Sequence, residues 1–118
     1  MSVFVASIDS RTTNRSYQVA IYGDNNGQPG TPVAYSATGT LAANAWNTLP
    51  ISATLAPNTT YWLVYNTNGR ASSVNNMRYD SGAAGSGAYS SGATPFGTWP
   101  ATFGASVVGP WRWSIYLT

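Results

Sequence analysis

The sequence contains no cysteine, histidine, lysine or glutamate. Without these residues, disulfides, zinc sites built from cysteine or histidine, thiol nucleophiles and a serine–histidine–aspartate triad are all excluded. The remaining carboxylates are Asp9, Asp24 and Asp80, and a glycosidase would need two of them to converge at a defined separation. Asp9 precedes a turn-like run and Asp24 opens a predicted hairpin loop, which is typical of turn residues. We therefore expect that the protein is not an enzyme.

Charge of either sign is sparse as well. Charged residues make up 7% of the chain, and the formal net charge is +2. Five scattered arginines supply too few phosphate contacts for nucleic-acid binding, which gains its affinity from many such contacts. No apolar run reaches the length of a membrane span, and the opening residues lack the basic and hydrophobic regions of a signal peptide. We expect no nucleic-acid partner and no membrane insertion.

Strong helix formers are scarce, whereas Asn, Thr, Ser, Gly and Tyr are abundant, and this composition favours strands and turns. We expect one domain, residues 1–118, without a long helix. Seven runs have strand character: residues 2–8, 17–22, 33–41, 46–51, 60–66, 73–79 and 111–117. Two further candidates, residues 85–90 and 101–108, interrupt a segment too long for an ordinary loop. These runs predict an all-β fold, an antiparallel β-sandwich of about eight strands arranged as in a jelly roll.

Particular positions in this fold can also be predicted. In residues 61–65 the odd-numbered and the even-numbered positions are all bulky or apolar, which predicts a central strand covered on both faces. Residues 23–32 are rich in Gly, Asn and Pro, which predicts an unusually long loop between two paired strands. Trp46, Trp62 and Trp113 lie in strand-like runs among apolar neighbours, so we expect these three rings in the core.

The segment from Tyr79 to Trp113 carries large aromatic rings through a nearly uncharged run rich in Gly, Ser, Ala and Pro. Aromatic faces can stack on the C–H faces of sugar rings, while polar groups beside them bond the hydroxyls. The predicted ligand-binding residues are four aromatic platforms and three hydrogen-bonding groups: Trp99, Trp111, Tyr89, Tyr79, Arg78, Asp80 and Asn76. The alternative for Trp99 is that the loop folds across the sandwich and uses this ring as a plug.

The run Asp24-Asn25-Asn26-Gly27 is rich in oxygen donors, as calcium loops are. Calcium binds six to eight oxygens, commonly from two or more carboxylates, whereas this run offers one. We interpret Asp24 as the cap of a turn and expect no metal or cofactor, with calcium at this loop as the alternative.

Three segments together resemble a family of accessory β-sandwich domains found in large secreted or surface-anchored bacterial and archaeal proteins: residues 17–30, 45–49 and 55–63. The closing residues 99–104 and 113–116 resemble the same domains. The resemblance implies an extracellular, jelly-roll-like module that is part of a larger protein of the cell surface.

Two functions follow from these observations. The first is a non-catalytic carbohydrate-binding module for a polysaccharide or glycan, which uses the aromatic loop as a platform. The alternative is a structural or adhesive module whose loop and exposed sheet edge pack on neighbouring copies, so that it self-associates.

Overall fold

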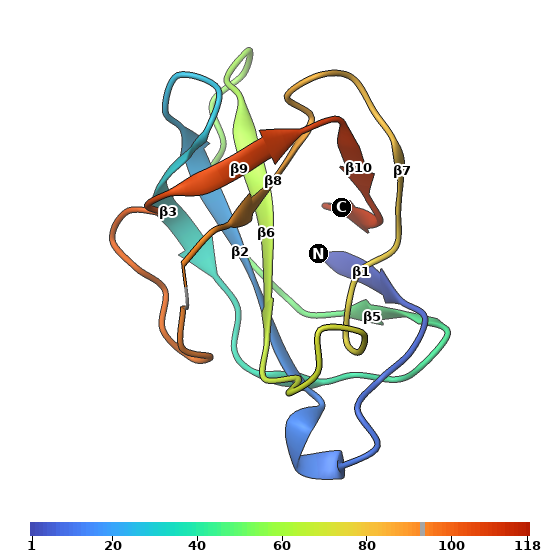
Figure 1. The fold of residues 1–118 in the computed structure, drawn as a ribbon. Coiled ribbons are helices and arrows are strands. Elements are labelled where there is room, and N and C mark those ends of the chain that lie inside the picture. Colours follow the sequence, from blue (N-terminus) through green and yellow to red (C-terminus); the bar gives the residue numbers. More distant parts are fainter. Residues whose placement is uncertain (93) are drawn as a thin grey trace.

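The computed structural model describes residues 1–92 and 94–118, and its fold is all-β, as predicted (Figure 1). Within these residues the helical structure is one turn of 3-10 helix, η1 (Thr12–Asn14). The strands are β1 (Ser2–Val5), β2 (Ser16–Asp24), β3 (Pro29–Tyr35), β4 (Gly39–Thr40), β5 (Ala45–Thr48), β6 (Tyr61–Thr67), β7 (Tyr79–Ser81), β8 (Gly87–Ser90), β9 (Ser106–Gly109), β10 (Trp111–Trp113) and β11 (Ile115–Tyr116). No helix in the described ranges is long and apolar enough to cross a bilayer.

Strand β2 is the centre of the first sheet. β3 and β4 pair antiparallel with β2 along one edge, and β6 pairs antiparallel with it along the other. The four consecutive residues from Val19 to Tyr22 are buried, so β2 has the double coverage expected of a central strand. The prediction that β6 is central is wrong, because β6 pairs with β2 alone among the described strands.

The second sheet is built around β1. This strand pairs antiparallel with β5 on one side and with β11 on the other. An isolated bridge from Val5 to Met77, and a hydrogen bond of 3.2 Å from the Arg78 amide to the Phe4 carbonyl, add the start of the β7 segment beside β1. β7 then pairs with β10, and β8 pairs with β9. Figure 1 shows β8 and β9 crossing over β6.

The core lies between these two sheets. Alternate residues of β1 and β2 point into it, namely Val3 and Val5 from one sheet and Tyr17, Val19 and Ile21 from the other. This alternation is the period of two that the sequence predicts for strands with one face on a core. The prediction of an antiparallel β-sandwich agrees with this arrangement, whereas the jelly-roll order of the strands stays a prediction.

The predicted strands differ from the observed ones mainly in length. The described residues form eleven short strands rather than about eight, because residues 33–41 and 111–117 are each interrupted. Both candidate strands in the long segment are confirmed, as β8 and β9, while Ala93 between them lies outside the described residues. The predicted strand 73–79 is a turn at its start, because Asn75 adopts a positive φ of 59°, then a single bridge at Met77, and it becomes strand β7 only from Tyr79.

The β2–β3 hairpin corrects the expectation of a long loop. Asn26 and Gly27 both have positive φ, at 53° and 81°, and the amide of Gln28 and the carbonyl of Asn25 close the turn at 3.2 Å. These are the features of a two-residue hairpin turn, for which Asn-Gly is a preferred pair. Pro29 and Pro32 lie within β3 itself, which the register shifts of this edge strand allow.

The three tryptophans predicted as core have different outcomes. Trp46 is 51% exposed, so its core assignment is wrong. Trp62 and Trp113 are half-buried, but they lie outside the core cluster and the residues packed against it. The inward position of β5 belongs to Asn47, whose side-chain oxygen accepts from the Ala42 amide at 2.7 Å. Because side chains of a strand alternate, Trp46 points to the outer face of the sheet.

A buried polar network joins the loop after β1 to the turn before β7. The Asn75 side chain is fully buried. Its Oδ1 accepts a hydrogen bond from the Asp9 amide at 2.9 Å. Its Nδ2 donates to the Asn14 carbonyl at 2.7 Å and to Thr67 Oγ1 at 2.9 Å. The Asp9 carboxylate in turn accepts from the Arg11 amide at 2.9 Å. One side chain thus ties three separate segments together.

The pKa shifts of the ionisable groups predict that the free energy of unfolding is constant over the neutral pH range. The backbone amide of Arg11 holds the pKa of Asp9 below its ordinary value of 3.8, and the Trp62 indole does the same for the pKa of Asp24. Stability from these carboxylates is therefore present above pH 3.8 and is lost as the pH falls below it. Burial raises the pKa of Tyr65 and Tyr17, so their contribution is present below pH 10.0 and is lost above it.

We therefore expect a melting temperature that changes by no more than about 2 °C between about pH 5 and 9 and falls on either side. Thermal unfolding across a pH series measures this. Asp9→Asn should flatten the acid limb, and a midpoint of stability loss near pH 6 or 7 would contradict the assignment of these groups.

Candidate functional site: an aromatic groove along β6

A groove of about 700 Å³ follows the edge of β6 to which no strand of residues 1–92 and 94–118 is paired. Residues of both parities line it, including Trp62 and Asn66 from one face of β6 and Leu63 and Tyr65 from the other. This is possible because the groove runs along the edge of the strand rather than over one face. An unpaired strand edge also presents backbone N–H and C=O groups, so the groove has polar groups along its length.

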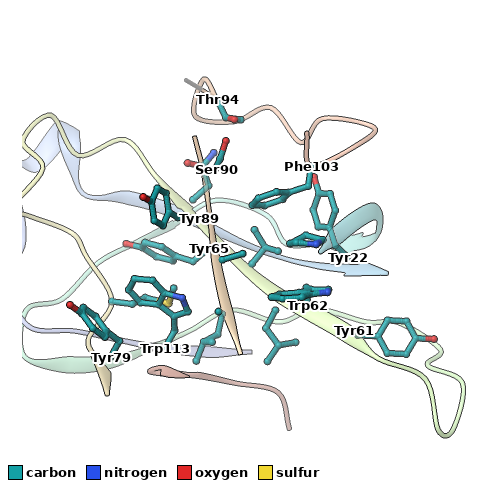
Figure 2. Close-up of a pocket in the computed structure, with 18 of the residues that line it drawn as sticks. Tyr22, Tyr61, Trp62, Tyr65, Tyr79, Tyr89, Ser90, Thr94, Phe103 and Trp113 are labelled. Carbon is teal, nitrogen blue, oxygen red and sulfur yellow. The ribbon is translucent and has the colours of Figure 1, made fainter. Parts of the chain in front are cut away.

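Aromatic side chains dominate the lining, and Figure 2 shows how they face one another across the groove. Tyr79, Tyr89 and Trp113 lie toward one end, whereas Trp62, Phe103 and Tyr22 lie toward the other (Figure 2). The complete aromatic lining in the described residues is Tyr22, Tyr61, Trp62, Tyr65, Tyr79, Tyr89, Trp99, Phe103 and Trp113.

The rings at the β7 end form a continuous row. Tyr79 packs on Trp113 with ring centroids 5.0 Å apart, Trp113 lies 6.2 Å from Trp111, and Trp111 lies 5.4 Å from Tyr89. Tyr79 and Tyr89, at the two ends of the row, are 56% and 48% exposed. Each presents an aromatic surface to solvent, while the tryptophans between them fix its position.

Gly87 lets β8 approach this row closely. A Cβ atom at this position would lie 2.8 Å from Trp113 Nε1, closer than side chains tolerate. Glycine is therefore required for β8 to cover one side of the groove, and any larger residue would push the strand away from β10.

At the other end, the loop of residues 94–105 packs onto β2 through Tyr22. The Tyr22 ring lies 6.2 Å from Trp99 and 5.6 Å from Phe103, and its hydroxyl donates to the Pro100 carbonyl at 3.0 Å. Trp99 is half-buried and also lines the groove. The ring therefore packs on the fold, as expected of a plug, and is also among the residues that line the groove.

Three N–H donors of the lining have no hydrogen-bond partner among the described residues, although the atoms themselves are buried: Trp99 Nε1, Trp113 Nε1 and Asn66 Nδ2. An unpaired buried donor costs about 1–3 kcal/mol, so such groups usually have a partner. Because these atoms are shielded from solvent, the polar side chains that a ligand in the groove can reach directly are others of the lining, such as Asn76, Ser90 and Thr94.

Trp62 Nε1 differs from these donors, since it donates to Asp24 Oδ1 at 2.7 Å. The other Asp24 oxygen accepts from the Gly27 amide at 3.1 Å, which is the turn-capping role predicted for this residue. Both carboxylate oxygens therefore have protein donors. Nowhere in residues 1–92 and 94–118 do three Asp, Glu, His or Cys side chains gather as a metal site would require.

The structure separates the seven predicted ligand-binding residues into two groups. Four of them line the groove: Trp99, Tyr89, Tyr79 and Asn76. Trp111 lies behind the lining and supports Tyr89.

The two charged residues of the prediction, Arg78 and Asp80, lie elsewhere. They flank Tyr79 in an extended segment, and Tyr79 points toward Trp113 in the groove, so their side chains point to the opposite face of the sheet. Asp80 forms an exposed ion pair of 3.8 Å with Arg112 on that face.

The sequence interpretation missed most of the floor of the groove. Trp62, Tyr65 and Asn66 belong to β6, where bulky residues at both parities were interpreted as a sign of a central strand. The pattern itself was informative, because residues of both parities are covered. On one face of β6, Leu63 and Tyr65 pack against the core. On the other face, Trp62 lies opposite Tyr22, on which the loop of residues 94–105 packs, so the coverage does not come from a second paired strand.

No protein-family model matches this chain, and neither the curated proteins nor the solved structures contain a match to it. The resemblance to accessory β-sandwich domains of surface proteins therefore stays a prediction.

Proposed function

We propose that the protein is a non-catalytic carbohydrate-binding module of the cell exterior, and that its ligand, a polysaccharide or glycan, occupies the groove along β6. The observation that carries this proposal is the combination of an aromatic lining with neutral polar side chains, among them Asn76, Ser90 and Thr94, in one concave site. Sugar rings suit such a site, since their C–H faces stack on aromatic rings and their hydroxyl groups form hydrogen bonds with amide and hydroxyl side chains. The volume of about 700 Å³ lies within the usual range for small-molecule sites.

The charge of the lining favours a neutral sugar. Arg112 is the only charged residue among the described residues that line the groove, and its side chain points to the opposite face of the sheet, where it is paired with Asp80. A carboxylate or sulfate group would enter this groove without a free cation to bind it. We therefore expect stacking and hydrogen bonding, rather than ion pairing, to give most of the affinity.

Tyr89→Ala and Tyr79→Ala should each weaken binding to a neutral polysaccharide by about 5- to 100-fold, by analogy with the 1–3 kcal/mol that stacked bases contribute in nucleic-acid platforms. Because both rings are about half exposed, the melting temperature should change little. Affinity electrophoresis on gels containing a panel of neutral polysaccharides measures the binding. Tyr35→Ala is the matched control, because Tyr35 is 64% exposed but lies on β3 outside the groove. Equal retention of all three variants would contradict the proposal.

The free edge of β6 supports a second function, self-association by strand addition. A strand from a neighbouring copy could pair along this edge and place alternate side chains in the groove, as in other cases of β-strand addition. Sedimentation velocity over a range of concentrations distinguishes the two functions. A concentration-dependent assembly with newly protected amides in β6, together with no retention on the panel, would favour the structural module.

A further inference from the structure

A second aromatic surface lies on the outer face of the β5–β1–β11 sheet. Trp46 is at its centre, with its ring centroid 5.6 Å from Phe4 and 4.9 Å from Tyr116. Trp46 is 51% exposed and Tyr116 is 42% exposed. The register explains the cluster, because Phe4 is directly opposite Trp46 in the antiparallel pair of β1 and β5. We call Phe4, Trp46 and Tyr116 the outer platform.

The outer platform is separate from the groove. Val3 and Val5, which flank Phe4, point into the core, so Phe4 and its cross-strand neighbours point away from it. None of the three rings lines the groove. Beside them, Ser2 Oγ and Thr48 Oγ1 form a hydrogen bond of 2.8 Å, so hydroxyl groups adjoin the rings.

Arg78 adds a positive charge to this face. Its backbone amide bonds to the Phe4 carbonyl, and the neighbouring residue Met77 bridges Val5 and packs on the core, so the Arg78 side chain shares the outer face with Phe4. The side chain is exposed and has no hydrogen-bond or ion-pair partner in the described part of the chain. Arg112, on the same face, is paired with Asp80. The face therefore has an unpaired cation beside aromatic rings and no unpaired carboxylate.

We propose that the outer platform and Arg78 form a second binding site, for an anionic polysaccharide whose sugars carry carboxylates. Trp46 and Tyr116 stack on the sugar rings, and the Arg78 guanidinium binds a carboxylate with the two parallel hydrogen bonds that this pairing favours. This proposal does not depend on the groove, where no free cation is available.

Two other occupants fit the face less well. A second copy bound through the same patch by two-fold symmetry would bring like charges together, since the face carries unpaired Arg78 and no free carboxylate to oppose it. Single-stranded nucleic acid also stacks on aromatic rings, but its affinity depends on several phosphate contacts, and Arg78 provides one. A polyuronate needs only ring stacking and one carboxylate contact at each site.

Binding of the full chain to polygalacturonate, to its fully methyl-esterified form and to single-stranded DNA tests the proposal, by affinity electrophoresis at low and high salt. We expect retention by polygalacturonate, retention at least about tenfold weaker in the neutral ester, and weakening by high salt. Trp46→Ala should weaken polygalacturonate binding by about 10- to 100-fold, and Arg78→Gln should weaken it by about 5- to 30-fold and remove most of the salt dependence.

The matched controls are Arg70→Gln, at an exposed arginine in a distant turn, and Tyr89→Ala, in the groove; both should bind polygalacturonate as the wild type does. Tyr116→Ala is a second platform variant in case Trp46→Ala does not fold. The proposal is overturned if polygalacturonate does not retain the protein, or if Arg78→Gln and both platform variants bind it as the wild type does. It is also overturned if the protein binds DNA more tightly than polygalacturonate, or if Tyr89→Ala alone abolishes retention.

Discussion

Asn75→Ala should lower the free energy of unfolding by about 3–5 kcal/mol, which is a large part of the stability of a small domain. The wild-type side chain is fully buried and bonds the Asp9 amide, the Asn14 carbonyl and Thr67 Oγ1. Alanine would leave the Asp9 amide and the Asn14 carbonyl without this partner, whereas Thr67 Oγ1 keeps its bond to the Ser16 carbonyl. Each unsatisfied buried group costs about 1–3 kcal/mol. Urea denaturation monitored by tryptophan fluorescence measures the change.

The positive φ of Asn75, at 59°, contributes to this cost, because alanine tolerates this conformation poorly. Asn75→Gly separates the two effects, since glycine accepts the backbone conformation but still removes the side chain. We expect it to recover only about 1 kcal/mol. Asn76→Ala is the control for an exposed neighbour and should change stability by less than about 0.5 kcal/mol. A loss below about 1 kcal/mol for Asn75→Ala would show that the network does not hold the three segments together.

Trp99→Ala should affect both stability and binding. We expect a loss of about 2–3 kcal/mol, less than the 3–5 kcal/mol of a fully buried aromatic side chain, because Trp99 is only half-buried. The missing ring would loosen the loop of residues 94–105 from Tyr22, with which Trp99 packs at 6.2 Å. It would also remove one wall of the groove, so retention on the neutral polysaccharide should fall below detection.

Trp99→Phe separates packing on the fold from stacking on the ligand. Phenylalanine keeps an aromatic ring against Tyr22 but presents a smaller face to the groove, so the stability loss should shrink to about 1 kcal/mol while binding remains weakened by about tenfold. Tyr22→Phe is a complementary control, since it removes only the hydrogen bond to the Pro100 carbonyl. Full binding by Trp99→Phe would mean that the ligand does not stack on the larger indole face.

The fold class could be predicted from local patterns. Scarce helix formers and runs of β-branched and aromatic residues specify strands, and β1, β2 and β6 lie within or overlap predicted runs. The lateral order of strands could not be predicted this way, because pairing is non-local. Because bulky residues occupy both faces of β6, the sequence predicted a central position for this strand. In the structure β2 occupies the centre of the sheet.

The orientation of single rings shows the same limit. Trp46 and Asn47 occupy opposite faces of β5, and hydrophobicity alone assigns the tryptophan to the core. The structure reverses this assignment because the Asn47 amide satisfies the backbone of the turn at Ala42, which no apolar residue could do.

Part of the candidate site was predictable, because its rings follow one another along a segment with few charges. Successive side chains of a strand point to opposite faces, so the sequence could have predicted that Arg78 and Asp80 lie on the face opposite to Tyr79. The groove itself could not be predicted from the sequence, since its position depends on which edge of β6 pairs with a strand and which does not.

Indole N–H signals in a ¹H–¹⁵N spectrum test the groove most directly, because the five tryptophans give separate resonances that Trp→Phe variants assign. We predict that a neutral oligosaccharide from the polysaccharide panel shifts the signals of Trp99 and Trp113, whose rings line the groove, and leaves that of Trp46 unchanged. A panel without any retained saccharide, or a bound saccharide that shifts neither Trp99 nor Trp113, would contradict a carbohydrate site in this groove.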